Sequence, residues 1–314
     1  MRTVITGGAG FIGSNLADAL VARGHEVTVV DDLSSGKEAN LRDAIAAGAV
    51  LEVGDVRDAA AMRDLVAATA PGAIVHLAAQ IDVRVSLDDP AYDARTNVEG
   101  TINMLEAARL AGVPRLVFAS TGGAIYGETA VIPTPETVEP RPMAAYGQSK
   151  YCAEAYLGLY ERLYGISTLA LRFGNVYGPR QDVHGEAGVI AIFCGLLRSA
   201  KRPKVYGSGE QTRDYIYVAD IVEAIATAIE GDDTGRINLG TEEETSVLRI
   251  VELLSGLEPD TDFSPELLDA RLGEVERSCL DATRARELLG WSARTPIAEG
   301  LRLTYAATAP VSAP

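Results

Sequence analysis

The first half of the chain alternates short β-branched and apolar runs with alanine- and leucine-rich stretches of helical periodicity. This alternation is typical of βαβ units, in which right-handed crossovers join neighbouring parallel strands. It predicts an α/β fold built on a doubly wound parallel sheet. The expected strands are Arg2–Thr6, Glu26–Val30, Val50–Val53, Ala73–Leu77, Arg115–Ala119 and Ser167–Arg172. The expected helices are Ile12–Arg23, Ala59–Ala70, Ala94–Ala111 and Tyr146–Tyr164.

A glycine-rich segment, TGGAGFIG from Thr6 to Gly13, joins the first expected strand to the first expected helix. There Gly7 permits a tight turn, Gly10 lets the backbone approach a pyrophosphate, and Gly13 allows close helix–strand packing. Three glycines alone also make an ordinary turn. The strand before and the helix after the segment favour a dinucleotide site in a Rossmann fold.

Acidic residues follow the second and third expected strands. Asp31 ends the second strand 18 residues after Gly13, where a carboxylate can bind the adenosine ribose. Together with Asp32 it would repel a 2′-phosphate, which favours NAD over NADP. The alternative is that these two acids only begin a loop. Asp55, after the third strand, suits either an adenine contact or a helix cap.

The pattern becomes irregular from Phe173 onward, where glycine- and proline-rich turns are frequent. Character typical of βα units returns around Tyr215–Glu230 and Arg236–Leu239. We therefore predict an NAD-binding Rossmann domain over residues 1–173, which the chain re-enters around residues 215–245. A smaller α/β domain over residues 174–314 would mainly bind substrate.

Composition narrows the class of protein. A formal net charge of −16 disfavours a nucleic-acid partner. The three cysteines lack CxxC spacing and a histidine cluster, so neither a disulfide framework nor a metal site is expected. No signal-peptide pattern precedes the first strand, and no apolar run approaches the roughly 20 residues of a membrane helix. We expect a cytoplasmic protein without a membrane partner.

Tyr146 and Lys150 form a Tyr–Lys pair at helical spacing, and Lys150 is one of only four lysines in the chain. Residues four apart share a helix face. A free tyrosine, with a pKa of about 10, is a poor base, and a nearby ammonium favours its phenolate. The pair therefore suits proton abstraction, although an exposed cation–phenol pair would have the same spacing.

Ser120 and Thr121 end the fifth expected strand, where a doubly wound sheet opens its crevice. A hydroxyl there could bond the reacting oxygen and hold a proton path to Tyr146. Serine and threonine at a strand end are also common turn residues.

Further segments, taken in order, carry a family resemblance. They are TGGAGFIGS from Thr6, HLAAQ from His76, NVEGTINMLEAA from Asn97, STGGAIYG from Ser120, YGQSK from Tyr146, LRFGNVYGPRQ from Leu171, TRDYIYVAD from Thr212, NLGT from Asn238, RLGEVERSCLD from Arg271 and LGW from Leu289. Over nearly the whole chain they resemble the extended short-chain dehydrogenase/reductase superfamily. Within it, the chain is similar to the NAD-dependent epimerase/dehydratase family, and especially to bacterial UDP-glucose 4-epimerases.

The resemblance implies a role for each matching residue. Tyr146 would be the catalytic base, Lys150 its partner and Thr121 the assisting hydroxyl, with Ser120 beside them. NAD would be lined by Gly7, Gly10, Phe11, Ile12, Asp31, Asp32, Ser35, Gly36, Asp55, Val56, Leu77, Ala78, Ala79, Gln80, Asn97, Ser120, Tyr146 and Lys150. The UDP-sugar would be held by Thr121, Tyr146, Asn175, Arg213, Tyr215, Arg271 and Ser278. An arginine fork suits its diphosphate.

The reaction implied is 4-epimerisation of UDP-glucose and UDP-galactose. Tyr146 would take the O4 proton as NAD accepts the C4 hydride, and both would return after the 4-keto sugar turns over. Because the nicotinamide ends as it began, NAD is expected to stay with the protein.

Gly122 and Gly123, which follow Thr121, bear on which reaction of this family is expected. Related 4,6-dehydratases carry a Thr-Asp-Glu pattern at the corresponding strand end, and UDP-glucuronate decarboxylases carry a glutamate nearby. With no acid at this point, epimerisation is favoured. The alternatives are 4-epimerisation of UDP-glucuronate, which differs in the shape of the sugar pocket rather than in mechanism, and another nucleotide-sugar epimerase or dehydratase. A non-catalytic NAD-binding sensor or scaffold is disfavoured by the retained Tyr–Lys pair.

Two positions bear on the sugar. Ser278 matches what resembles the gatekeeper position, where some relatives carry tyrosine, so UDP-GlcNAc and UDP-GalNAc are expected substrates as well. Gly174 stands where some relatives have an aromatic residue, so the sequence does not predict which residue forms the floor of the sugar pocket.

The resemblance also implies a homodimer. Its four-helix interface would be formed by the helices near Asp93–Ala111 and Gly147–Tyr164.

Overall fold

The computed structural model describes residues 1–183, 188–269 and 275–308, which include a sheet of seven parallel strands. The strand order is β11-β6-β5-β4-β1-β2-β3. This order confirms the predicted doubly wound α/β fold. The bounds are β1 Arg2–Thr6, β2 Glu26–Asp31, β3 Val50–Val53, β4 Ala73–His76, β5 Arg115–Thr121, β6 Ser167–Phe173 and β11 Gly235–Leu239.

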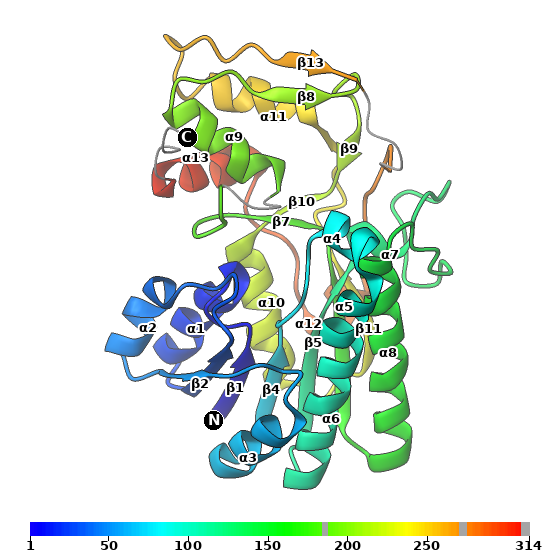
Figure 1. The fold of residues 1–314 in the computed structure, drawn as a ribbon. Helices are drawn as coiled ribbons and strands as arrows, with labels where there is room; N and C mark the ends of the chain where they lie inside the picture. The colour runs from blue at the N-terminus through cyan, green and yellow to red at the C-terminus, as the bar shows by residue number, and fades with distance from the viewer. Residues whose placement is uncertain (184–187, 270–274, 309–314) are drawn as a thin grey trace.

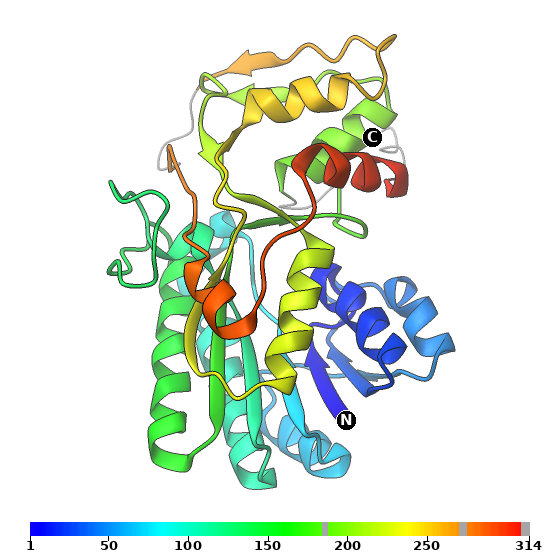
Figure 2. The same cartoon turned by 180° about the vertical axis from the view of Figure 1, so that it is seen from behind.

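Helices cover both faces of this sheet (Figure 1, Figure 2). On one face α1 packs against α10, and on the other α6 lies between α3 and α8. Their bounds are α1 Phe11–Ala22, α3 Ala59–Thr69, α6 Gly100–Ala111, α8 Ala145–Tyr164 and α10 Val218–Glu230.

Each central strand sends alternate side chains into two apolar cores. In β1, Ile5 joins the larger core and Val4 the smaller one. In β5, Val117 and Phe118 divide in the same way. Side chains of a strand alternate with a period of two, so a strand covered on both faces is a continuous apolar run. That double burial is why these strands were predicted from sequence.

The predicted helix Ala94–Ala111 is less regular than expected. A π-helical turn over Arg95–Glu99 separates α5 (Pro90–Ala94) from α6. Asn97 in this turn is 1% exposed, and its Nδ2 donates a hydrogen bond to the Gln80 carbonyl at 2.8 Å. This contact joins segments distant in sequence, and turns of this kind are frequent near functional sites.

The rest of the chain forms short paired strands and four further helices. β7 (Asn175–Tyr177) pairs with β10 (Tyr215–Tyr217), β9 (Thr212–Arg213) with β12 (Thr245–Ser246), and β8 (Lys204–Tyr206) with β13 (Glu266–Leu268). The helices are α9 Val189–Arg198, α11 Val247–Ser255, α12 Thr283–Leu289 and α13 Ile297–Ala307. Shorter helices are α2 Arg42–Ala46, α4 Val83–Asp88, α7 Gly122–Ile125 and a 3₁₀ turn at Glu38–Leu41.

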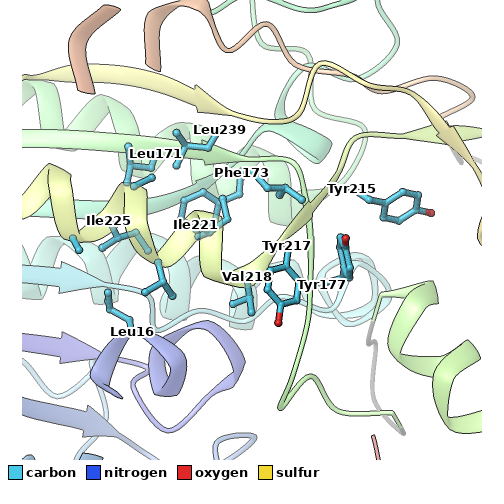
Figure 3. Packing of buried hydrophobic residues seen from close by; sticks show 14 of the residues in the cluster. Leu16, Leu171, Phe173, Tyr177, Tyr215, Tyr217, Val218, Ile221, Ile225 and Leu239 are labelled. Atoms are coloured by element: carbon cyan, nitrogen blue, oxygen red, sulfur yellow. The ribbon is translucent and has the colours of Figure 1, made fainter. Parts of the chain in front are cut away.

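The larger apolar core continues from the sheet into this second part. Leu171 and Phe173 at the end of β6 belong to the same cluster as Tyr177 and Tyr217 (Figure 3). The chain returns to the sheet at β11, which pairs with β6. The division into two domains near residue 173 stays a prediction. Within the described ranges, no helix is long and apolar enough to cross a membrane.

Candidate active site

The chain turns sharply from β1 into α1. Gly7 has a φ of +67°, and a Cβ there would lie 2.7 Å from the backbone nitrogen of Ala78. A Cβ at Gly13 would collide with the Gly7 carbonyl oxygen. Glycine is therefore required at both positions, and the backbone can approach a ligand at the N-terminus of α1.

A cavity of about 900 Å³ lies where the carboxyl ends of the sheet strands meet this turn. Ligands bind at this edge in open α/β sheets. Most of the predicted cofactor residues line it: Gly7, Gly10, Phe11, Ile12, Asp31, Asp32, Ser35, Asp55, Val56, Leu77, Ala78, Ala79, Gln80, Ser120, Tyr146 and Lys150. Their contacts with a cofactor stay predictions.

Two further residues predicted to line NAD, Gly36 and Asn97, are not among the residues that line the cavity, and their contacts with a cofactor stay predictions. A Cβ at Gly36 would lie 2.6 Å from Asp31 Oδ1, so this glycine makes room for the carboxylate. Asn97 is buried, and its Oδ1 accepts a hydrogen bond from the Gln80 backbone at 3.0 Å. Both residues therefore contact a residue of the cavity wall, Gly36 beside Asp31 and Asn97 beside Gln80.

The Asp31 carboxylate is fixed by the backbone on both sides. Oδ2 accepts from Ala9 N and Oδ1 from Leu33 N, both at 2.9 Å. Burial raises the pKa of Asp31 more than these hydrogen bonds lower it. A partly desolvated carboxylate facing the cavity is a strong acceptor for hydroxyl groups, which suits a ribose better than a loop start.

Asp55 is held by an arginine that the sequence analysis did not single out. Arg57 Nε donates to Asp55 Oδ2 at 2.9 Å, and hydrogen bonding by Arg57 lowers the pKa of Asp55. Asp58, rather than Asp55, caps α3 by accepting from Ala60 N and Ala61 N. The helix-cap alternative for Asp55 therefore does not hold.

Tyr146 and Lys150 lie on the same face of α8, and both line the cavity. Lys150 is 2% exposed, and its Nζ donates to the Ala119 carbonyl at 2.9 Å. Burial lowers the pKa of Lys150 to about 8, against the attraction of Asp93 and Glu154. Burial also raises the pKa of Tyr146 to about 12, and a hydrogen bond with Thr121 opposes this shift. An exposed cation–phenol pair is excluded.

The two hydroxyls at the end of β5 have different partners. Thr121 bonds to Tyr146 and accepts from Ala124 N at the start of α7. Ser120 donates to Glu154 Oε1 at 2.6 Å. Thr121 is thus the hydroxyl that reaches the tyrosine, whereas Ser120 lines the cavity and is tied to α8.

A buried ionic network supports this end of the site. Arg172 on β6 donates to both Glu154 oxygens, at 2.9 and 2.6 Å, and both side chains are fully buried. Arg172 Nη1 also donates to the Tyr126 hydroxyl at 2.7 Å. Glu154 follows Lys150 by one helical turn, so the network fixes α8 against β5 and β6. The acid four residues after Lys150 was a signal for it in the sequence.

The predicted sugar residues gather beyond Thr121. Asn175 and Tyr215 are register partners in β7 and β10, and Arg213 lies in β9, two residues before Tyr215. Ser278 N donates to the Thr212 carbonyl at 3.2 Å. A Cβ at Gly123 would lie 3.1 Å from Asn175 Oδ1, so this group adjoins the end of β5. Arg271 lies outside the described residues.

Gly174, at the junction of β6 and β7, leaves no room for a side chain. A Cβ there would lie 2.8 Å from the Asp214 carbonyl oxygen. The aromatic residue of some relatives would therefore collide with Asp214 in this chain.

Known proteins share both the motifs and the fold. Residues 3–240 match the profile of the NAD dependent epimerase/dehydratase family. The chain belongs to this family. The UDP-glucose 4-epimerase of Mycolicibacterium smegmatis is 46% identical over 308 residues, which are 97% of each chain.

Solved structures of similar epimerases superpose over almost the whole chain. The UDP-glucose 4-epimerase of Thermotoga maritima, solved with UDP-glucose, has a TM-score of 0.94 at 43% identity and covers 98% of each chain. A UDP-N-acetylglucosamine 4-epimerase from Methanobrevibacter ruminantium, solved with UDP-N-acetylmuramic acid, has a TM-score of 0.92 at 31% identity. It covers 98% of this chain and 97% of its own.

The cavity fits the NAD of this epimerase/dehydratase family. The glycine turn offers backbone N–H groups where a diphosphate docks, and Asp31 offers acceptors for a ribose. Arg180 also lines the cavity, and its Nη1 is buried without a partner among the described residues. The sequence analysis missed Arg180, whose neighbours in the fold are distant in sequence. In the described part of the chain, no group of three or more His, Cys, Asp or Glu side chains could hold a metal.

Proposed function

We propose that this chain is a 4-epimerase of UDP-hexoses that uses NAD held in the cavity. The arrangement that carries the proposal is Tyr146, paired with Lys150 and bonded to Thr121, in a cavity that the glycine turn and Asp31 also line. The names of the similar proteins support the same activity.

The chain's own residues would handle the sugar proton. Tyr146, as phenolate, accepts the O4 proton and later returns it. Lys150 stabilises the phenolate electrostatically, and Thr121 holds the oxygen in line. When bound, NAD supplies a reversible carrier for the C4 hydride. The network of Glu154 and Arg172 keeps these groups in place, since it anchors α8 beside β5.

The space beside Thr121 argues against elimination chemistry. A Cβ at Gly122 would collide with the Leu280 side chain, and one at Gly123 would lie 3.1 Å from Asn175 Oδ1. An acid at either position would therefore need its neighbours to move. Dehydration needs a second acid–base group, whereas in epimerisation the tyrosine is the one group that takes and returns a proton.

The first test is incubation of the purified protein with UDP-galactose and no added NAD, followed by proton NMR of the sugar. We expect UDP-glucose to grow to an equilibrium mixture, because a cofactor regenerated in each turnover needs no supply. No conversion, even with NAD added, would remove UDP-galactose as a substrate. UDP-glucuronate and the N-acetylated sugars would then be tested in turn.

Ser278 supports a wider sugar range. Its small side chain lies beside β9 at the predicted sugar end, so we propose that UDP-GlcNAc and UDP-GalNAc are epimerised too. Ser278→Tyr should lower the turnover of N-acetylated relative to plain sugars about tenfold or more, because the ring would occupy the acetyl space. Ser278→Ala is the matched control and should leave the ratio unchanged. An unaltered ratio in Ser278→Tyr would show that Ser278 is not the gatekeeper.

We also propose a cytoplasmic homodimer. Its three cysteines are free thiols, as is usual in a reducing compartment. Leu110 on α6 and Tyr156, Leu163 and Tyr164 on α8 are exposed by 37 to 61%. Exposed apolar side chains on adjacent helices support pairing of this face with a second copy.

A further inference from the structure

Strand β7 and the segment that follows it carry buried polar side-chain atoms that have no partner among the described residues. Buried side-chain atoms without a partner include Asn175 Oδ1, Tyr177 Oη, Arg180 Nη1 and Gln181 Oε1. Buried polar groups are nearly always hydrogen-bonded in proteins, so a cluster of them points to a ligand or to ordered water. Arg180 and Gln181 also line the large cavity, which associates this segment with its ligand.

Arg180 is held over α1 in an unusual conformation. Its φ is +71°, uncommon for a residue with a side chain and often found at functional sites. Its Nη2 pairs with Asp18 Oδ2 at 2.5 Å, and Asn15 Nδ2 donates to the Pro179 carbonyl at 3.1 Å. Both partners are on α1, and the segment after β7 passes close to that helix (Figure 1). The guanidinium is thus fastened beside the helix whose N-terminus lines the cavity.

The other cations that line the cavity are already engaged. Lys37 is 60% exposed and pairs with Asp182. Arg57 directs Nε and Nη2 to Asp55, and Lys150 donates to the Ala119 carbonyl at the tyrosine end. Among the described cationic residues that line the cavity, Arg180 is therefore the one whose buried N–H donor, Nη1, has no hydrogen-bond partner.

We propose that Arg180 binds the diphosphate of NAD, beside the glycine turn, and that Asp18 holds its guanidinium in position. A planar guanidinium can bond a carboxylate through one nitrogen and a phosphate oxygen through another. The diphosphate docks at the N-terminus of α1, and Arg180 adds the cation that backbone N–H groups lack. This inference rests on the proposed function, because it takes NAD as the resident cofactor.

The test compares nucleotide binding in four full-length variants. The NAD content of each purified protein is measured after gel filtration, and the affinities of the nucleotide-depleted protein for NAD, ADP-ribose and adenosine by calorimetry. Arg180→Gln should weaken NAD and ADP-ribose binding about ten- to hundredfold and leave adenosine binding unchanged, because only the first two carry a diphosphate. Arg180→Lys should restore part of the loss. Arg23→Gln, which breaks another ion pair of α1 away from the cavity, is the matched control.

Asp18→Asn separates a phosphate ligand from a merely structural clasp. The amide oxygen can still accept from Nη2, and a negative charge near the diphosphate is removed, so affinity should stay equal or rise. Equal losses in Arg180→Gln and Asp18→Asn would indicate only a structural ion pair and overturn the proposal. So would unchanged ADP-ribose affinity in Arg180→Gln. A wild-type protein that binds neither NAD nor ADP-ribose would overturn the proposed function itself, and this inference with it.

Discussion

At the scale of residues, burial shifts the pKa values of Tyr146 and Lys150 in opposite directions, because it disfavours the charged form of each. It disfavours the phenolate and the ammonium alike, raising one pKa to about 12 and lowering the other to about 8. Side by side, the two charges offset this cost. The loss of the Lys150 charge therefore removes the electrostatic support of the base.

This coupling sets the pH dependence of the reaction. Lys150, with its pKa lowered to about 8, is an ammonium below that pH and becomes neutral above it. We expect the wild-type rate of UDP-galactose conversion to rise as pH rises through about 8, because the phenolate–ammonium pair holds one proton fewer than the neutral phenol beside the ammonium. Lys150→Arg should be slower at pH 7 and should show this rise only at higher pH, because a guanidinium keeps its proton and Tyr146 alone must lose one.

The measurement is the initial rate from pH 6 to 10 with saturating sugar. Tyr146→Phe serves as the reference, with a rate about 10² to 10⁴ times lower at every pH. A rise with the same midpoint in Lys150→Arg would assign that titration to another group.

Which residues could be predicted depends on how near their partners are in sequence. Asp31 and the Tyr146–Lys150 pair stand at fixed distances within a βα unit or a helix, so spacing alone located them. Arg180 depends on Asp18, far along the chain, and Asn97 on Gln80 across a loop. Without the fold, Arg180 reads as a surface charge, and the hydrogen bonds between Asn97 and Gln80 cannot be predicted.

At the scale of elements, long or fully buried segments followed from sequence, and short ones did not. The strands of the main sheet are apolar runs covered by helices on both faces, which leaves a clear pattern. β9 and β12 have two residues each, and β7 and β10 have three. No period can be read from so few residues, and long-range pairing alone defines them.

Helix α8 shows how one element organises the site. Tyr146, Lys150 and Glu154 are spaced by four residues and face the carboxyl end of β5 and its neighbour β6. Glu154 bonds to Ser120 on β5 and Arg172 on β6, so the position of the helix is fixed by buried charge as well as by packing. Burying such a pair is costly unless its geometry is well satisfied, which makes the anchor specific to one register.

At the scale of the whole molecule, cofactor and sugar residues come from distant parts of the chain but share one framework. The larger apolar core runs from α1 through the sheet to α9 and α11. Asn175, Arg213 and Tyr215, which are predicted to bind the sugar, therefore belong to the same framework as Tyr146. Because the core is continuous, displacement of the second part would disrupt packing at the end of β6 (Figure 3).

The proposed dimer would use the face of α6 and α8 opposite the sheet. Tyr156 and Leu163 are seven residues apart on α8 and so share a helix face, next to Leu110 of α6. We expect the wild-type protein to have twice its chain mass of 33.1 kDa by light scattering. The double change Tyr156→Glu and Leu163→Glu should give monomers, because it would bury like charges from both copies.

Leu267→Glu provides the control for that measurement. Leu267 on β13 is 58% exposed, close to the 61% of Leu163, but it lies on the opposite part of the molecule (Figure 1). This variant should remain a dimer, since added surface charge alone does not separate a buried interface. A monomeric wild type, or a dimer that survives the double change in α8, would contradict the proposed interface. Loss of the dimer in Leu267→Glu alone would place the interface on the β8–β13 face instead.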